Sequence, residues 1–461
     1  MADIYVDNST FQTAPVGMSF TTTGCTINAG DNTRIDAAAG TPFVAAGVGN
    51  PLYVINTGVT WVTGVYIIQT VEGAGSGVTL DRAVGTAGYT GLSASHTPCS
   101  GAAESPSGPT GPYPTIQMAI DNSSAGDTIW LKNNTQYGYS GYKFDNLDQP
   151  VHSATEHIMI DSGGSTTANT WLTICGHSGS KTPVLVTLDA NGADVKLILI
   201  DDVDNIKLQY LKIYNAGATS GEGINITNGS DHQAYVIEDC EFDTSGKYGI
   251  RGGTNSWCIV IRDCVFSNQN AASYVIFVGY ESMTSIINNV FESGDGGTTF
   301  IRDVSRHMHV EGNIFGKCSR GIFVYSDAKH ITVCNNVFYD VQASCIELNA
   351  ATSGFNAFNN IFVVADGAAD YVIKRTAGSI NYSDYNCAYA ISGSITNGWG
   401  FEGSNSFEAD PQFVLPASDD FRLLPGSPCL NTGKPTPGNG FTNTGYSSIG
   451  AWQRKSFLGI N

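Results

Sequence analysis

The stretch NNVFYDVQASCIELNAATSGFNAFNNIF, residues 335–362, opens on the phrase NNVF and closes on NNIF. The same phrase occurs four more times before it, as DCEF, DCVF, NNVF and GNIF. The phenylalanines that end these phrases are separated by 24, 25, 24, 23 and 24 residues, and they are Phe242, Phe266, Phe291, Phe315, Phe338 and Phe362. Such regular spacing over six units indicates a stack of similar structural repeats.

Each repeat holds two short apolar segments joined by turns rich in Gly, Asn and Ser. The apolar residues do not follow a helical period, which argues against leucine-rich and α-helical solenoids. A unit of this length with short strands fits one coil of a parallel β-helix, whose coils stack at roughly 4.8 Å. The sequence therefore predicts an all-β, single-stranded parallel β-helix of about 24 residues per coil.

Stacked coils place equivalent residues above one another, so each position of the repeat becomes a column. The phenylalanines predict an aromatic stack in the core. Stacked asparagines two residues earlier can pass amide hydrogen bonds along the axis. That column reads Cys240, Cys264, Asn289, Asn313, Asn336 and Asn360. Five residues before each Phe, a third column is aliphatic and is expected to face inward: Ile237, Ile261, Ile286, Val310, Val333 and Ala357.

Two flanking segments resemble a known fold superfamily. The segment PYPTIQMAIDNSSAGDTIWLKNNTQY, residues 112–137, resembles the opening of pectate-lyase-like right-handed β-helices, where a short helix covers the first coil. Thr115 is the expected N-cap of that helix. Residues 409–433 and the phrase IGAW, residues 449–452, look like terminal coils of β-helix proteins of bacteria and phages. The resemblance implies a right-handed coil and assigns no reaction.

The chain divides by composition into four parts. Residues 1–99 lack the repeat and form an expected β-rich attachment segment, 100–112 a Gly/Ser/Pro linker, 113–452 the β-helix with its helical cap, and 453–461 a tail. The phrase TLDRAVGTAG, residues 79–88, resembles segments that precede β-helices in phage virion proteins. That resemblance implies localisation in a virion. Synthesis in a host cytoplasm is expected, because residues 1–12 lack the basic and apolar regions of a signal peptide.

The composition restricts the class of partner. The 461 residues include 22 basic and 41 acidic side chains, for a net charge of -19. Nucleic acid and anionic membranes both require clustered Lys and Arg, so neither is expected as a partner. No stretch approaches the roughly 20 apolar residues of a membrane span. The 11 cysteines lack metal-ligand spacing, so we expect buried reduced thiols, with no metal and no cofactor.

Two acidic groups are weak candidates for catalysis. In LILIDDVDNI, Asp202 and Asp204 would share one face of a strand. In IRDVSRHMHVEGN the candidates are Asp303, His307, His309 and Glu311, and alternation places the last three on one outward row. Neither group has the partner phrases that the hydrolases or lyases of this fold carry. Turn carboxylates for the first group and a solvated sheet face for the second are the favoured explanations.

The residue directly before each Phe forms a further column that is aliphatic in five coils. It contains Val265, Val290, Ile314, Val337 and Ile361. With regular alternation this stripe points outward and would be buried against another protein or another copy of the chain. A local bulge would instead turn it inward.

Two functions follow from these patterns. The first is a non-enzymatic virion protein, a phage capsid decoration or cement protein that binds the major capsid protein or another virion protein, as an expected homotrimer. Its basis is the missing catalytic phrases, the missing secretion signal, the phage-like phrase at residues 79–88 and the aliphatic stripe. The alternative is a tailspike-type polysaccharide depolymerase, a lyase or glycoside hydrolase, that acts on a host surface glycan. Whether the chain is an enzyme stays open at this point, with the sequence favouring the non-enzymatic function.

Overall fold

A computed structural model of the chain describes the strands between residues 3 and 96 and most of residues 116–451. The ranges that it leaves out after residue 116 are short: 122, 133–141, 144–155, 162, 165–169, 179–181, 191–195, 215, 218, 228–233, 244–245, 254–257, 268–273, 280–282, 293, 295–296, 304–305, 326–328, 350–353, 377–378, 396–402 and 435–447. The expected linker 100–112 and tail 453–461 lie outside the described residues.

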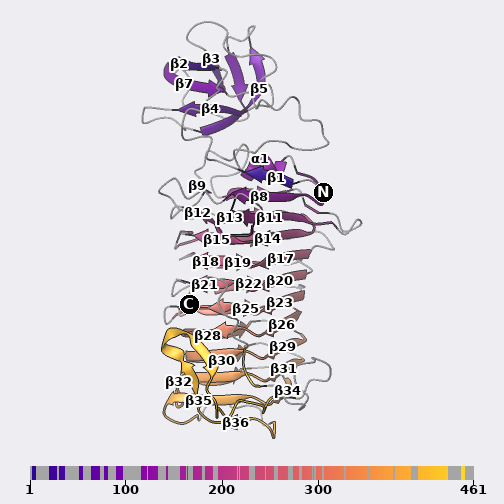
Figure 1. The fold of residues 1–461 in the computed structure, drawn as a ribbon, viewed down its shortest axis with the longest axis vertical. Helices are drawn as coiled ribbons and strands as arrows, with labels where there is room; N and C mark the ends of the chain where they lie inside the picture. Colours follow the sequence, from indigo (N-terminus) through magenta and orange to yellow (C-terminus); the bar gives the residue numbers. More distant parts are fainter. Residues whose placement is uncertain are drawn as a thin grey trace.

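The main body is a right-handed parallel β-helix, as the repeat predicts (Figure 1). Its first wall, sheet A, has 11 strands that lie one per coil and pair in parallel. They are β1 (Asp3–Val6), β8 (Thr128–Lys132), β11 (Leu172–His177), β14 (Ile206–Gln209), β17 (Ala234–Glu238), β20 (Cys258–Arg262), β23 (Met283–Ile287), β26 (His307–Glu311), β29 (Ile331–Cys334), β31 (Phe355–Phe358) and β34 (Ile380–Asp384).

The other two walls belong to one 19-stranded sheet, and we call them bank B and bank C. Bank B contains β10 (Glu156–Ile160), β13 (Lys196–Ile200), β16 (Glu222–Ile226), β19 (Tyr248–Arg251), β22 (Tyr274–Val278), β25 (Thr299–Asp303), β28 (Cys318–Val324), the second half of β30 (Val337–Leu348) and β33 (Tyr371–Arg375). Bank C contains β9 (Tyr142–Lys143), β12 (Val186–Asp189), β15 (Leu211–Tyr214), β18 (Glu241–Asp243), β21 (Val265–Ser267), β24 (Val290–Phe291), β27 (Ile314–Phe315), the first half of β30, β32 (Ile361–Asp366), β35 (Cys387–Ser392) and β36 (Phe407–Glu408).

The inward columns are those that the repeat predicts. The six phenylalanines are fully buried, and their rings stack with centroids 4.5 to 5.2 Å apart. The asparagines form a hydrogen-bonded ladder: Asn313 Nδ2 donates to Asn336 Oδ1 over 3.0 Å, and Asn336 Nδ2 donates to Asn360 Oδ1 over 3.0 Å. The ladder extends to Asn386, because Asn360 Nδ2 donates to Asn386 Oδ1 over 3.1 Å.

The backbone conformation explains why the first residue of each phrase is Asp, Asn or Gly. Asp239, Asp263, Asn288, Asn335 and Asn359 all have φ between 53° and 59°, and Gly312 in the same place has φ 69°. This left-handed conformation is accessible to Asp, Asn and Gly at little cost. It turns the chain from sheet A into bank C, so the phrase DC/NN/GN is the signature of that corner.

The N-terminal side closes with a helix and an additional strand. Helix α1 (Ile116–Asp121) buries Ile116, Ala119 and Ile120 against the first coil, as the resemblance implied. Strand β1 pairs with β8 in sheet A, Asp3 opposite Thr128, so residues 3–6 join the solenoid rather than the N-terminal segment. No helix among the described residues is long and apolar enough to cross a membrane.

The N-terminal segment folds as an antiparallel β-barrel of six strands. Their order is β2-β3-β6-β5-β4-β7. The strands are β2 (Phe20–Asn28), β3 (Asp31–Asp36), β4 (Pro51–Ile55), β5 (Gly64–Glu72), β6 (Gly77–Leu80) and β7 (Thr90–His96). Figure 1 shows the barrel beyond the end of the solenoid that α1 covers.

The C-terminal segment departs from the expectation of further coils. Residues 409–451 contain an antiparallel hairpin, β37 (Phe413–Leu415) and β38 (Asp420–Leu423), joined through the 3-10 turn η4 (Pro416–Ser418). In Figure 1 this segment turns back beside β28, β30 and β32. Ile449 N donates to Cys429 O, and Gly450 N donates to Asn359 O, which ties the end of the segment to the solenoid.

The aliphatic stripe does point outward, but the expectation that another protein covers it is wrong for three of its members. Ile314, Val337 and Ile361 are 7, 1 and 0% exposed, because the C-terminal segment of this same chain packs on them. Phe413, Phe421, Cys429 and Ile449 form the other side of that contact. Val265 and Val290, further along bank C, are half-buried.

Candidate functional site

The first pair of carboxylates that the sequence singled out, Asp202 and Asp204, lies in a turn. Asp202 and Asp204 are between β13 and β14, not on a strand, and Asp202 has φ 50°. Around them the chain is held by Thr227 Oγ1, which donates to Asp201 Oδ1 over 2.7 Å, and by Tyr235 Oη, which donates to Val203 O over 2.9 Å. This location matches the expected role of turn carboxylates.

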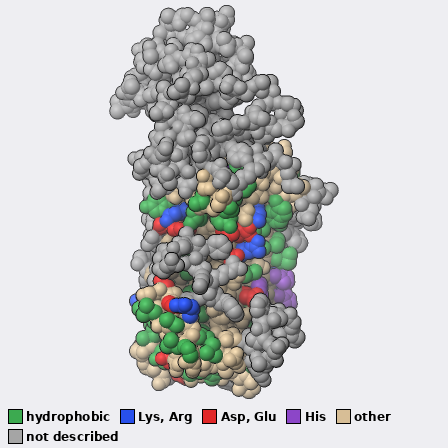
Figure 2. All heavy atoms as spheres, viewed as in Figure 1, with side chains coloured by type: hydrophobic (Ala, Val, Ile, Leu, Met, Phe, Trp, Pro, Cys, Tyr) green, Lys and Arg blue, Asp and Glu red, His purple; other side chains and the backbone are tan. Residues whose placement is uncertain are grey.

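The structure separates the second group of candidates. Asp303 ends β25 in bank B, whereas His307, His309 and Glu311 occupy the next wall, on β26 of sheet A. The three residues of β26 alternate with buried Met308 and Val310, so they form an outward row. Histidine side chains gather in one patch on the flank of the solenoid in Figure 2. His307 stacks on His330 of the following coil, with ring centroids 5.0 Å apart.

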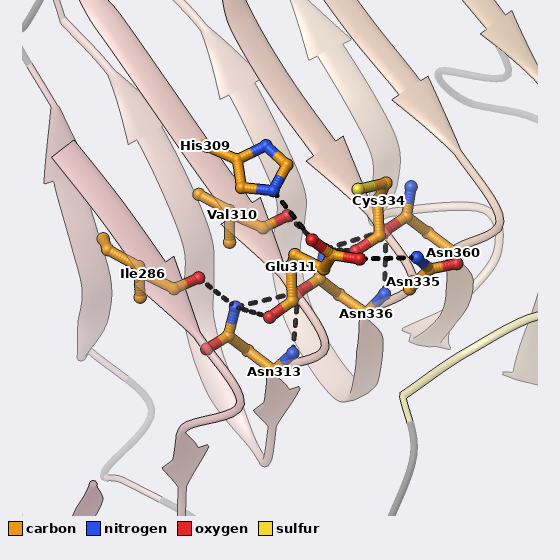
Figure 3. A network of polar contacts seen from close by, with 9 residues as sticks. All are labelled: Ile286, His309, Val310, Glu311, Asn313, Cys334, Asn335, Asn336 and Asn360. Carbon is orange, nitrogen blue, oxygen red and sulfur yellow. Dashed lines mark hydrogen bonds and ion pairs between the residues drawn. The ribbon is translucent and has the colours of Figure 1, made fainter. Parts of the chain in front are cut away.

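The row also meets a cysteine that the sequence did not connect with it. Cys334 lies opposite Glu311 in the parallel register of β26 and β29. His309 Nε2 is 2.8 Å from Glu311 Oε2, and Asn335 Nδ2 donates to Glu311 Oε1 over 3.1 Å (Figure 3). The hydrogen bond from His309 lowers the pKa of Glu311 against the opposing effect of burial. Burial raises the pKa of the Cys334 thiol to about 12.

The other cysteines agree with the expectation of reduced thiols. The nine described cysteines are all free, and eight of them are buried. Cys258, which faces outward from β20, is half-buried. Cys25 and Cys99 carry no described side chain.

Bank B presents an outer face that the sequence analysis missed. Two of its outward columns stack in register from β16 to β33. The first column is Glu222, Tyr248, Tyr274, Thr299, Arg320, Ser344 and Tyr371. The second is Asn225, Arg251, Phe277, Arg302, Phe323, Glu347 and Lys374. Aromatic rings, cations and two carboxylates therefore share one flat face, which we call the aromatic face.

Arg302 is at the centre of the aromatic face and is surrounded by rings. Its guanidinium carbon is 4.5 Å from the ring centroid of Tyr325, 4.7 Å from that of Tyr274 and 5.4 Å from that of Phe277. Each of these distances is within the range of a cation–π contact. No ion pair to Arg302 occurs among the described residues, and its buried Nε has no hydrogen-bond partner. The centre of the face thus has a cation, without an ion-pair partner among the described residues, between the half-buried rings of Tyr274 and Phe277 and the exposed ring of Tyr325.

The cations on either side of Arg302 are already paired. Arg251 Nη1 is 2.9 Å from Glu222 Oε1. Glu347 accepts from Arg320 Nε over 2.7 Å and from Lys374 Nζ over 3.1 Å. Burial would raise the pKa of Glu347, but these two hydrogen bonds outweigh burial and the pKa lies below its ordinary value.

The two carboxylates of the aromatic face are too distant to act as one catalytic pair. Glu222 is on β16 and Glu347 on β30, five coils apart, which is roughly 24 Å at 4.8 Å per coil. Glycoside hydrolases hold their two carboxyl groups within about 5–9.5 Å. The arrangement is instead suited to binding: rings offer apolar platforms with hydrogen-bonding tips, and guanidinium groups offer donors in a fixed plane.

Comparisons with known proteins agree with this fold. Residues 196–386 match the family model described as the right handed beta helix region. The crystal structure of pectate lyase Pel9A is 13% identical and superposes with a TM-score of 0.50 over 74% of this chain and 91% of the lyase. The solenoid of this chain therefore has a right-handed β-helix fold, like that lyase.

Two further proteins are similar to parts of this chain. A capsule K30/K69-specific depolymerase of Klebsiella phage K64-1 is 21% identical over 248 residues. That alignment covers 50% of this chain and 30% of the depolymerase, so the chain spans less than a third of its relative's length. An alginate lyase of Paenibacillus sp. is 15% identical, with a TM-score of 0.34 over 59% of this chain and 95% of the lyase.

Proposed function

We propose that this chain is the polysaccharide-binding β-helix of a phage tailspike-type depolymerase, and that its glycan lies along the aromatic face. The observation that carries the proposal is the cluster of Tyr274, Phe277 and Tyr325 around Arg302. Sugar rings have apolar faces that pack on aromatic side chains, while their hydroxyl and acidic groups take hydrogen bonds from a guanidinium. The open stack of coils suits a long polymer, since each coil repeats the face every 4.8 Å or so.

The relative from Klebsiella phage K64-1 supports the choice of a depolymerase, because that protein is specific for a capsule. The capsid decoration role has lost one of its supports. That role drew on an aliphatic stripe free to bind another protein, and three of the five stripe residues are covered by Phe413, Phe421, Cys429 and Ile449 of the chain itself. We therefore favour a tail location in the virion over the capsid lattice.

The test is binding and cleavage of capsular polysaccharides by the full chain. Purified capsules from a panel of Klebsiella serotypes are a suitable first set, with viscosity, reducing ends and unsaturated products as readouts. We expect one or a few capsules to bind, and to be shortened. Tyr325→Ala and Tyr274→Ala should each weaken binding about 10-fold, the effect of losing roughly 1.4 kcal/mol.

Tyr214→Ala is the matched control, because Tyr214 is an exposed ring on bank C, away from the aromatic face. It should leave glycan binding unchanged. Equal losses in Tyr214→Ala and Tyr325→Ala would contradict the assignment of the face. Labelling of whole particles separates the two virion roles, since a signal over the capsid lattice would overturn the tail location.

A further inference from the structure

We propose that His309, Glu311 and Cys334 form a binding site for a divalent cation of the zinc class, with solvent completing the coordination. The three side chains each offer one ligand atom, a ring nitrogen, a carboxylate oxygen and a sulfur, and these atoms lie within 4.8 Å of one another. The site is on the outer side of sheet A, on a different wall from the aromatic face. It is therefore independent of the proposed glycan site.

The residue types select the metal. Imidazole nitrogen and thiolate sulfur are ligands of zinc and cobalt, whereas calcium and magnesium prefer sites made only of oxygen. Three protein ligands with a solvent-facing fourth position are typical of zinc sites that stay open to exchange. The side chains of His309 and Glu311 are 39% and 40% exposed, so water can reach that fourth position.

The scaffold holds the ligands without help from loops. His309 and Glu311 are two residues apart on β26, and Cys334 is opposite Glu311 on β29, so the parallel register of two adjacent strands fixes all three (Figure 3). Asn335 Nδ2 donates to Glu311 Oε1 and leaves Oε2 directed at His309. A hydrogen bond of this kind to a ligand carboxylate orients it for the metal.

Binding has a defined proton balance. A cysteine thiol, with an ordinary pKa of about 8.5, is mostly protonated at neutral pH before metal enters. Coordination replaces the S–H bond by a bond from sulfur to the metal, and the proton leaves to solvent. The sulfur keeps its electron pair throughout, and no oxidant or reductant is needed.

The test uses the untagged full chain and Co²⁺, because cobalt takes the place of zinc and reports on its ligands by absorption. We expect one tight equivalent of Co²⁺ per chain, with the intense d–d bands of a four-coordinate ion and a near-ultraviolet sulfur-to-cobalt band, all displaced by one equivalent of Zn²⁺. Cys334→Ser should remove the sulfur-to-cobalt band and lower affinity at least 10-fold. Asn335→Gly keeps the left-handed corner but removes the amide that donates to Glu311, and it should lower affinity about 10-fold through loss of orientation.

Two neighbours serve as controls. Cys258→Ser alters another outward thiol on the same sheet, and His307→Gln alters another imidazole on the same strand. Both should keep the cobalt spectrum and affinity of the unmodified chain. His309→Gln changes a half-exposed side chain and so supplies a ligand variant whose folding does not depend on a buried position. The proposal is overturned if the chain takes up no cobalt, or if binding survives both Cys334→Ser and His309→Gln.

Discussion

Arg302 Cζ lies 4.5 Å from the ring centroid of Tyr325, and this pair joins two adjacent coils at the centre of the aromatic face. Tyr325 is 48% exposed, while Arg302 has its other side on Tyr274. The guanidinium is thus held among aromatic rings, without a carboxylate partner among the described residues. A cation held ready in this way spends little conformational entropy when an anionic or hydroxyl group binds.

The first prediction concerns this cation. Arg302→Gln should weaken binding of the cognate polysaccharide about 10-fold or more, since a hydrogen bond to a charged group contributes roughly 1.5–3 kcal/mol. Arg302→Lys should recover only part of the loss, because an ammonium keeps the charge but lacks the planar stacking surface. Isothermal titration with defined capsule fragments measures both. Arg375→Gln removes an exposed cation from β33 as a control, and a loss equal to that of Arg302→Gln would point to net charge rather than to this site.

The second prediction is a pH dependence of stability. Hydrogen bonds from Arg320 and Lys374 outweigh the effect of burial and hold the pKa of Glu347 below its ordinary value. A carboxyl whose pKa is lower in the folded chain than in the unfolded chain stabilises the fold. The contribution is fully present at a pH above the pKa in the unfolded chain, about 4.3, and it is lost as the pH falls through the pKa in the folded chain. Glu347→Gln should therefore lower the free energy of unfolding by about 1–3 kcal/mol at neutral pH. At a pH well below 4, the difference in free energy of unfolding between Glu347→Gln and the unmodified chain should be smaller.

Urea unfolding followed by circular dichroism at neutral and acidic pH measures this difference. Glu408→Gln is the matched control, because Glu408 is exposed on β36. It removes the same charge and should shift the unfolding midpoint little at either pH. A deficit in Glu347→Gln that stays constant from neutral to acidic pH would show that the ion pairs are not its cause.

The inward half of this structure was predictable from the sequence, because inward positions repeat their chemistry from coil to coil. Phe291 stacks on Phe315, the equivalent residue of the next coil, and Asn313 likewise bonds to Asn336. Because each inward position needs the same residue type in every coil, the period of the repeat is visible in the sequence. The corner residues, such as Asn288 and Asn335, were part of the same phrase. Their positive φ explains the repetition, although the sequence reasoning assigned them no role.

The outward half was not predictable in the same way. Outward residues need only be compatible with solvent, so they vary along the stack, and the contacts form between coils of unequal length. Bank B even shifts register between Cys318 and Arg320. The aromatic face left one usable signal, the tyrosines that open the second apolar segment of several repeats, Tyr248, Tyr274 and Tyr371. Glu311 and Cys334 each lie four residues before the Phe of their repeat, so the period does align them. The residue type at this position changes from coil to coil, and the pair therefore did not stand out as a site.

The third prediction tests the asparagine ladder. Asn336→Ala removes the acceptor of Asn313 Nδ2 and of the Asn313 backbone N–H, and the donor to Val310 O and Asn360 Oδ1. Each buried polar group left without a partner costs roughly 1–3 kcal/mol, so the total loss should exceed about 3 kcal/mol. Denaturant unfolding gives the value. Asn356→Ala, at a half-buried outward position, should cost less than about 1 kcal/mol, and similar costs at both sites would argue against the ladder.

The fourth prediction concerns the cover of bank C. Phe421 is 2% exposed and packs with Phe413 and Tyr339 over the aliphatic stripe. Phe421→Ala should loosen the C-terminal segment by about 3–5 kcal/mol, which is the usual cost of removing a buried phenyl ring. The coils beneath keep their own Phe and Asn columns, so the main unfolding transition should move far less. Limited proteolysis within residues 409–451 and binding of a hydrophobic dye report the opening.

The same experiment distinguishes an internal cover from an interface. If Ile314, Val337 and Ile361 are buried only by this segment, Phe421→Ala should increase dye binding and self-association together, because an apolar stripe is then exposed. Leu415→Ala, at a position 53% exposed on the same hairpin, should do neither. Unchanged protease resistance and dye binding in Phe421→Ala would mean that the stripe is protected by something other than its own C-terminal segment, and a second copy of the chain would again be a candidate.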